Sequence, residues 1–141
     1  MGPRILLPTD GSKPARDAIR YTYETFDDPA VTALHVIPVS DGYWTAFEGM
    51  EDRIPNYDEA LEHAEAVLAE ADSIAAERDG SLETEIETGE PERTIIEHGE
   101  AGEYDLIVLG SHGREGLSRM MLGSVAEKVV RRSPTPVLVV R

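Results

Sequence analysis

The chain has 141 residues, which suits one domain over residues 1–141, and its 28 acidic against 13 basic residues give a formal net charge of −15. A surface of that charge repels nucleic acid and anionic membranes, and the lack of cysteine excludes disulfides, thiol catalysis and cysteine-ligated metal. No apolar run approaches the ~18 residues of a membrane span and the first residues lack the pattern of a signal peptide, so we expect a cytoplasmic protein.

The first predicted elements are a strand, a helix and a second strand. The apolar run Arg4–Pro8 ends in the turn residues Thr9-Asp10-Gly11-Ser12. A helix follows over about 12–26, because apolar residues recur there at helical spacing. Residues 31–37 are again apolar and stop at Pro38, so they predict the second strand.

The segment 39–56 is an unusually long connection between predicted elements. It contains glycines and prolines together with the aromatic residues Tyr43, Trp44 and Phe47. Two interpretations stay open. The segment is a lid or contact surface, or it is a loop with a helical turn whose aromatic side chains cover the edge of the sheet.

The middle of the chain is strongly acidic, with 19 acidic and 3 basic residues over 48–103. Within it, apolar residues spaced by three and four predict a long amphipathic helix over 57–79, and alternation over 82–88 predicts a half-exposed strand near a sheet edge. Gly89-Glu-Pro91 opens a third helix that ends near Ala101. The acidic residues suit solvated helix faces, and they also suit a halophilic protein in a high-salt cytoplasm.

Three spaced glycines mark the most informative segment. An apolar strand over 106–109 runs into Gly110-Ser-His-Gly113, and Gly123-Ser124 follows nine residues later at the start of a helix that ends near Arg132. Glycine lets a backbone approach a ligand closely, and Ser124 as N-cap would leave the first helical amides turned towards an anion. The segment therefore predicts a phosphate-binding loop, and an ordinary glycine-rich loop with a serine cap is the alternative.

The charge of this last third of the chain agrees with an anionic ligand. Residues 104–141 carry 6 basic and 3 acidic residues, with Arg114, Arg119 and Lys128 close to the glycines. A nucleotide can be accepted there, whereas the acidic remainder of the chain argues against a DNA duplex.

The last strand runs from Pro136 to Val140, which completes five strands alternating with four helices. This alternation predicts an α/β fold, a Rossmann-like or flavodoxin-like three-layer sandwich with a mostly parallel sheet.

Ligands bind beyond the carboxyl ends of such strands, where the strand order reverses. Asp10 and Gly110 both follow strand ends and share a crevice if the first and fourth strands are neighbours. There Asp10 can hold a ribose hydroxyl or a magnesium ion carried by phosphates, or it caps the first helix in an Asx turn.

Five motifs together give the sequence a family resemblance. The stretches Ile5-Leu-Leu-Pro-Thr-Asp-Gly-Ser12, Leu34-His-Val36, Gly89-Glu-Pro91, the glycine segment and Pro136-Val-Leu-Val-Val140 resemble universal stress proteins of the ATP-binding subgroup. The resemblance implies the sheet order 3-2-1-4-5 and a site for ATP or another adenine nucleotide, with magnesium held through Asp10. The residues implied to surround the nucleotide are Pro8, Thr9, Asp10, Val36, Gly110, His112, Gly113, Arg114, Gly123, Ser124 and Val125.

The resemblance also implies separate roles within this set. Asp10 would contact the ribose or the metal, the backbone of Val36 would hydrogen-bond adenine, and Gly110 would lie against the ribose. The phosphates would be surrounded by Gly113, Gly123, Ser124 and Val125.

A homodimer is a further implication of the resemblance, formed by antiparallel pairing of the last strands. The sequence offers its own reason, because residues 137–140 are apolar and uncharged, and an exposed edge of that kind invites another strand. An edge covered by the chain's own loops is the alternative.

The sequence therefore predicts a regulatory stress-response protein that binds ATP with magnesium and changes its behaviour towards an unknown protein partner. A slow ATP hydrolase, an interaction module whose glycine loop is empty, and a flavin carrier are the alternatives. No catalytic residue is assigned. An enzyme would need a general base and a group that stabilises charge at the γ-phosphate, and His112 and Arg114 are the only candidates near the glycines.

We expect His35 to be a packed core residue. His63 and His98 should face solvent and bind no metal, because neither has a second ligand four residues on.

Overall fold

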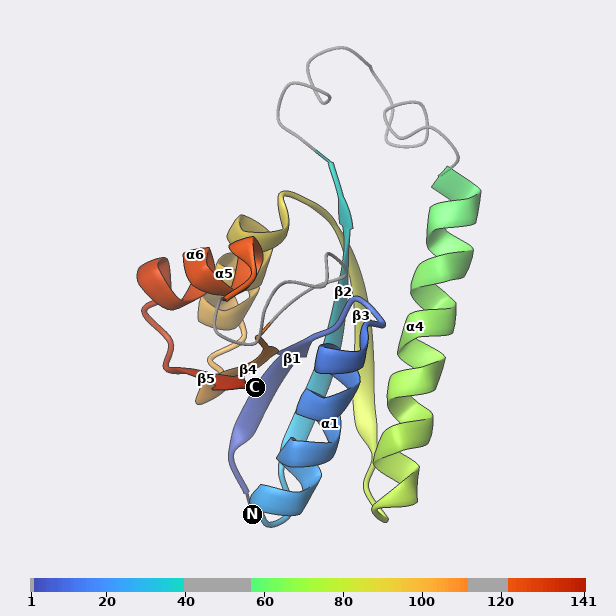
Figure 1. Cartoon of the computed structure of the whole chain (residues 1–141), viewed down its shortest axis with the longest axis vertical. Helices are drawn as coiled ribbons and strands as arrows, with labels where there is room; N and C mark the ends of the chain where they lie inside the picture. Colours follow the sequence, from blue (N-terminus) through green and yellow to red (C-terminus); the bar gives the residue numbers. More distant parts are fainter. Residues whose placement is uncertain (1, 40–56, 112–121) are drawn as a thin grey trace.

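The computed structural model describes residues 2–39, 57–111 and 122–141, in which five strands and four helices alternate along the chain (Figure 1). Each element predicted from the sequence is present, with ends that differ by at most two residues. The connection predicted over 39–56 lies, beyond Val39, outside the described residues. The elements are β1 Arg4–Pro8, α1 Lys13–Thr25, β2 Ala30–Pro38, α4 Tyr57–Glu77, β3 Leu82–Gly89, α5 Pro91–Ala101, β4 Leu106–Gly110, α6 Ser124–Arg132 and β5 Val137–Val140.

The five strands form one parallel sheet in the order β3-β2-β1-β4-β5. The central strand β1 pairs on both sides, with Ile5 opposite Val31 of β2 and Leu106 of β4. This confirms the expected sheet order and makes β1 and β4 neighbours. The chain runs outward from β1 to β3 and then crosses to β4 on the other side, so the strand order reverses between β1 and β4.

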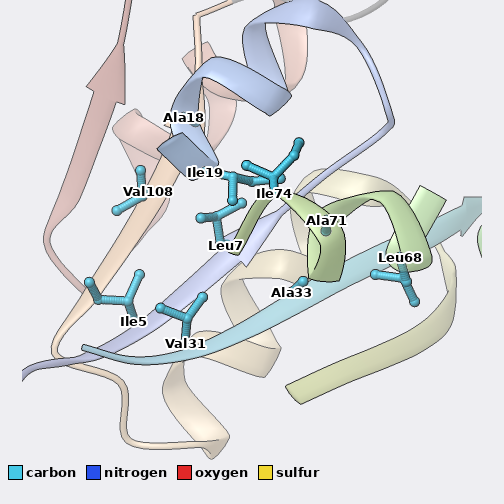
Figure 2. Close-up of a cluster of buried hydrophobic side chains, with 10 residues drawn as sticks. All are labelled: Ile5, Leu7, Ala18, Ile19, Val31, Ala33, Leu68, Ala71, Ile74 and Val108. Carbon is cyan, nitrogen blue, oxygen red and sulfur yellow. The ribbon is translucent and has the colours of Figure 1, made fainter. Parts of the chain in front are cut away.

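Two helices cover each face of the sheet. α1 and α4 pack together on one face, and α5 and α6 pack together on the other (Figure 1). Alternate residues of β1 point to opposite faces, so Ile5 and Leu7 enter the core beneath α1 and α4 that Figure 2 shows, whereas Leu6 enters the core beneath α5 and α6. The protein is thus a three-layer α/β sandwich, which confirms the predicted fold class.

The two edge strands differ in character. β3 exposes Glu83, Glu85 and Glu87 and half-buries Leu82 and Ile86, which is the alternation predicted for a strand near a sheet edge. All four residues of β5, at the opposite edge, are half-buried and apolar. Across residues 2–39, 57–111 and 122–141, no helix has both the length and the apolar composition that a membrane crossing needs.

Candidate functional site

A pocket of about 360 Å³ lies at the carboxyl ends of the central strands. Its walls come from the ends of β1, β2 and β4, from the turn after β1, from the start of α6, from two positions on α5, and from single positions on α1 and α4. Because β1 and β4 are the strands between which the order reverses, the pocket occupies the place where α/β sheets bind their ligands.

The pocket gathers most of the residues that the sequence predicted to bind a nucleotide. Three others, His112, Gly113 and Arg114, lie outside the described residues, as does Arg119. The predicted residues that line the pocket are Pro8, Thr9, Asp10, Val36, Gly110, Gly123, Ser124 and Val125.

The turn after β1 carries the carboxylate of the site. The amide of Ser12 donates to Oδ1 of Asp10 at 2.9 Å, and the amide of Gly11 donates to Oγ1 of Thr9 at 3.3 Å. Gly11 has φ +81°, a left-handed conformation that favours glycine. The Asx turn considered from the sequence is therefore present, but the side chain that caps α1 is that of Ser12, which accepts from the amide of Ala15. Asp10 thus shapes the turn with its carboxylate and lines the pocket.

The start of α6 differs from the prediction. Gly123 is the N-cap, with an extended backbone (φ −67°, ψ 159°) and no side-chain capping bond, and its carbonyl accepts the amide of Glu127 at 2.9 Å. The prediction of Ser124 as N-cap is wrong, because Ser124 already belongs to the first turn of the helix. In an α-helix the amides of the first residues have no intrahelical acceptor. The amides of Ser124, Val125 and Ala126 therefore have no acceptor within α6, and these three residues line the pocket, where an anion can meet them.

Gly110 has a structural reason to be glycine that the sequence did not reveal. A Cβ built on it would lie 2.6 Å from the carbonyl carbon of Pro14 and 2.7 Å from its oxygen. The end of β4 therefore contacts the backbone of α1 directly. Gly110 also lines the pocket, so it serves both the packing of β4 on α1 and the shape of the pocket.

Two histidines of the described residues line the pocket. His35 is 7% exposed, which confirms the predicted core position, and its Nδ1 lies 2.9 Å from the carbonyl oxygen of Thr9. Because a carbonyl oxygen only accepts, Nδ1 of His35 carries the proton in this contact. The ring of His63, on α4, meets the His35 ring edge to face with centroids 5.8 Å apart. Both residues line the pocket, a role that their sequence neighbours did not predict.

His98 departs from its prediction of solvent exposure. Its side chain is 20% exposed and pairs through Nε2 with Glu85 of β3. Its ring also stacks on Tyr104, with centroids 6.2 Å apart. The sequence could not reveal these partners, because the three residues come together only when α5 packs on the sheet.

Lys128 was expected near the anion site, but its Nζ lies 3.4 Å from Oε1 of Glu92 on α5. Glu92 is 7% exposed. Burial alone would raise the pKa of Glu92, but its own backbone amide and the Lys128 charge outweigh burial and hold the pKa below the ordinary 4.5. Lys128 therefore neutralises a buried carboxylate that joins α5 to α6. Among the described lining residues there is no Lys or Arg, so amides and the helix dipole would have to attract an anion.

Comparison with known proteins agrees with this architecture. The Universal stress protein family matches residues 1–141. Universal stress protein MJ0531 of Methanocaldococcus jannaschii is 34% identical over 140 residues, which cover 98% of this chain and 81% of that protein. A solved structure of the hypothetical protein MJ0577 has a TM-score of 0.81 at 29% identity, covering 98% of this chain and 94% of the other.

A third relative was solved with a ligand. The structure of a universal stress protein from Archaeoglobus fulgidus in complex with dAMP has a TM-score of 0.71 at 22% identity and covers 99% of this chain and 97% of the other. At that identity the likeness establishes a shared fold. The family match over the whole length shows that the chain belongs to the universal stress protein family.

Proposed function

We propose that the protein binds an adenine nucleotide, ATP with magnesium, in the pocket at the carboxyl ends of β1, β2 and β4. The observation that carries this proposal is the position of the first turn of α6, whose residues Ser124, Val125 and Ala126 line the pocket. Their amides and the helix dipole favour an anionic group. The volume of about 360 Å³ falls within the roughly 300–1,000 Å³ that is typical of small-molecule sites.

The base of the nucleotide is proposed to lie on the apolar side of the pocket. Val36 and Pro38 of β2 and Pro91 and Ile95 of α5 line that side, and flat heteroaromatic rings suit such a surface. Adenine is proposed because the Archaeoglobus fulgidus relative was solved with dAMP. In this arrangement the backbone of Val36 would hydrogen-bond the base, and Gly110 would lie against the ribose.

Magnesium is proposed to arrive on the phosphates. The described residues contain no group of three or more His, Cys, Asp or Glu that could hold a metal ion. Mg²⁺ is usually bound by one or two carboxylates together with substrate phosphates and water, so the single carboxylate of Asp10 fits this mode. When bound, the ion would screen the charge of the phosphates from Asp10.

The biological role that we propose is regulation in the stress response, in the cytoplasm, through nucleotide-dependent contact with a partner protein. Membership of the universal stress protein family supports this role. Measurement of phosphate release from ATP separates a regulator from a slow hydrolase of the same fold. For a regulator, we expect bound MgATP to remain unhydrolysed and no phosphate to be released over many minutes.

We also propose a homodimer through β5. The carbonyls of Pro136 and Val140 accept amides of Ile107 and Ser111, so the backbone groups of these alternate residues face β4. The intervening Val137 and Val139 then turn their amides and carbonyls to the outer edge. Proline is tolerated where an amide faces away from the sheet, so Val139→Pro should preserve the β4 ladder and abolish the dimer. Light scattering after gel filtration tests this, and a dimeric Val139→Pro protein would contradict pairing through β5.

A thermal-shift panel tests the choice of nucleotide. The nucleotide-stripped protein is heated with ATP, ADP, AMP, cyclic AMP, GTP and FMN, each with and without Mg²⁺. At 100 times its Kd, a ligand that binds only the folded state stabilises it by about 2.7 kcal/mol, which gives a shift of several degrees. We expect the adenine nucleotides to shift the midpoint and GTP and FMN to leave it unchanged. Equal shifts with GTP would contradict adenine recognition, and a shift with FMN alone would favour a flavin carrier.

A further inference from the structure

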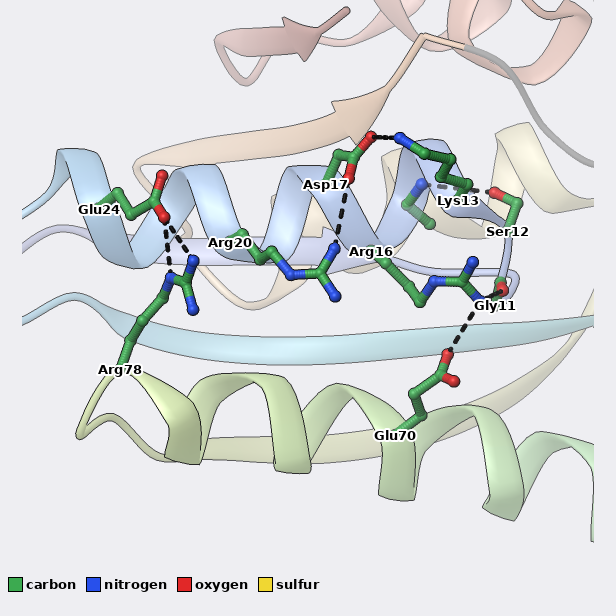
Figure 3. A network of polar contacts seen from close by, with 10 residues as sticks. Gly11, Ser12, Lys13, Arg16, Asp17, Arg20, Glu24, Glu70 and Arg78 are labelled. Carbon is green, nitrogen blue, oxygen red and sulfur yellow. Dashed lines mark hydrogen bonds and ion pairs between the residues drawn. The ribbon is translucent and has the colours of Figure 1, made fainter.

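The turn at Gly11, next to Asp10, is linked through Arg16 to Glu70, as Figure 3 shows. Arg16 of α1 donates from Nη1 to the carbonyl oxygen of Gly11 at 3.2 Å. The same nitrogen lies 3.6 Å from Oε1 of Glu70 on α4. One guanidinium thereby connects the turn after β1 to both helices on that face of the sheet.

The turn also packs directly against α4. A Cβ built on Gly11 would lie 3.0 Å from Cγ2 of Val67, so little space separates the turn from the helix. Val67 stands between His63, which lines the pocket, and Glu70, which pairs with Arg16. These positions are spaced by four and three and share one face of α4. One stripe of α4 thus contacts the pocket, the turn and the arginine that holds the turn.

We infer that Arg16 and Glu70 are positioning residues for the nucleotide site, which fix the Asp10 turn without touching the ligand. Neither is among the described residues that line the pocket. The hydrogen bond from Arg16 fixes the Gly11 carbonyl, and the adjacent Asp10 carboxylate is oriented by the same turn through the Ser12 amide. The inference rests on the proposed function of this pocket, because it assigns these two residues a role in nucleotide affinity.

Arg16→Gln and Arg20→Gln form a matched pair that tests the role of Arg16. Arg20 lies one helical turn further along α1, its side chain is 37% exposed against 36% for Arg16, and it pairs with Asp17 at 3.3 Å. Each substitution removes one positive charge, so a general electrostatic effect on ATP should be similar for both. We expect Arg16→Gln to raise the Kd for MgATP about fivefold and Arg20→Gln to change it by less than about 1.5-fold, since only Arg16 holds the turn.

Glu70→Ala separates positioning from charge by the sign of its effect. Removal of a carboxylate near the site would strengthen ATP binding if charge alone mattered. If Arg16 has a positioning role, loss of its ion pair with Glu70 should instead raise the Kd for MgATP by about twofold to threefold. Glu65→Ala, an exposed position on the same helix, removes the same charge and is the control. Thermal unfolding of every variant without ligand checks that the fold is kept.

The outcomes distinguish the inference from the function on which it rests. Weaker binding by Arg16→Gln and Glu70→Ala, with the control variants unchanged, supports the positioning role. If the wild-type protein binds MgATP but Arg16→Gln matches Arg20→Gln, or if Glu70→Ala binds more tightly, the inference is overturned and the nucleotide site stands. If the wild-type protein binds no nucleotide, both are overturned. If Arg16→Gln fails to fold, the direction of the Glu70→Ala effect still decides the matter.

Discussion

The amide of Gly123 donates to the carbonyl oxygen of Ser111 at 2.7 Å, and this hydrogen bond fixes the first turn of α6 to the end of β4. The amide of Ser111 in turn donates to the carbonyl of Val140 on β5 at 2.9 Å. The start of α6 is therefore tied to two strands of the sheet. The amides that we propose to bind phosphate are thus anchored to the sheet, and their residues line the same pocket as the ends of β1 and β4.

Gly123→Val should remove nucleotide binding and keep the fold. Gly123 is buried and lines the pocket, and its φ of −67° and ψ of 159° are accessible to valine. The added side chain should occupy space that the phosphates need, so we expect the Kd for MgATP to rise at least about tenfold. Calorimetric titration measures the affinity and circular dichroism checks the fold. Unfolding of the variant would instead assign Gly123 a structural role.

Gly110→Ala should destabilise the fold itself, because its Cβ would lie 2.6 Å from the backbone of Pro14. Overpacking of this kind costs about 1–3 kcal/mol, so the unfolding midpoint in urea should fall clearly. Gly99→Ala is the control. There a Cβ would meet side-chain atoms and no backbone, with Cδ1 of Ile107 at 3.1 Å and Oγ1 of Thr135 at 3.6 Å, and alanine favours the helix by about 1 kcal/mol over glycine. Equal stability losses in the two variants would contradict the contact between β4 and α1.

Asp10→Asn should separate the two roles of Asp10. The amide oxygen of asparagine can still accept the hydrogen bond of the Ser12 amide, so the Asx turn and the stability should be kept. The loss of charge should abolish the gain in ATP affinity that Mg²⁺ provides, and it should leave binding of Mg²⁺-free ATP unchanged or stronger. Titrations with and without Mg²⁺ measure this difference. A Mg²⁺ effect as large as in the wild type would exclude Asp10 from the metal site.

Tyr23 should make the fold sensitive to alkaline pH. Burial, aided by the nearby Asp72 carboxylate, raises the pKa of Tyr23 from 10.0 to about 12. The folded state thus favours the neutral phenol, whose hydroxyl donates to the carbonyl of Ser81 at 2.7 Å. The free energy of unfolding that the neutral Tyr23 phenol contributes is fully present below pH 10. It is lost as the pH rises from 10 towards 12.

Tyr23→Phe should remove this alkaline sensitivity. The variant loses about 1 kcal/mol of stability at neutral pH with the hydrogen bond to Ser81. Its stability should then fall less steeply than that of the wild type between pH 10 and 12. Tyr21→Phe, at an exposed position of the same helix, should follow the wild type. Urea unfolding at a series of pH values measures this, and parallel curves for Tyr23→Phe and the wild type would refute the assignment.

The fold was predictable because its signals are local and strong. The apolar runs of β1 and β4 reflect burial on both faces of the sheet, whereas the spacing of apolar residues on α4 and the alternation in β3 reflect burial on one face of each element. The position of the pocket followed from topology, since residues after the ends of β1 and β4 must meet once these strands are neighbours.

The details that escaped prediction depend on contacts between distant elements. The pairing of Lys128 with Glu92 and of His98 with Glu85 arises only when α5 packs on α6 and on the sheet. The contact of Gly110 with Pro14 and the place of His63 in the pocket have the same origin. The N-cap of α6 was misassigned by one residue because Gly123 and Ser124 both suit that position.

Isothermal titration of the nucleotide-stripped protein with ATP and Mg²⁺ tests the central claim most directly. We predict binding of one nucleotide per chain with a Kd in the micromolar range, equivalent to about −8 kcal/mol. Titrations at low and high salt, with the Gly123→Val protein beside them, show whether the interaction depends on this pocket. An absence of heat at both salt concentrations, confirmed by equilibrium dialysis, would contradict the account and leave the pocket as part of an interaction module.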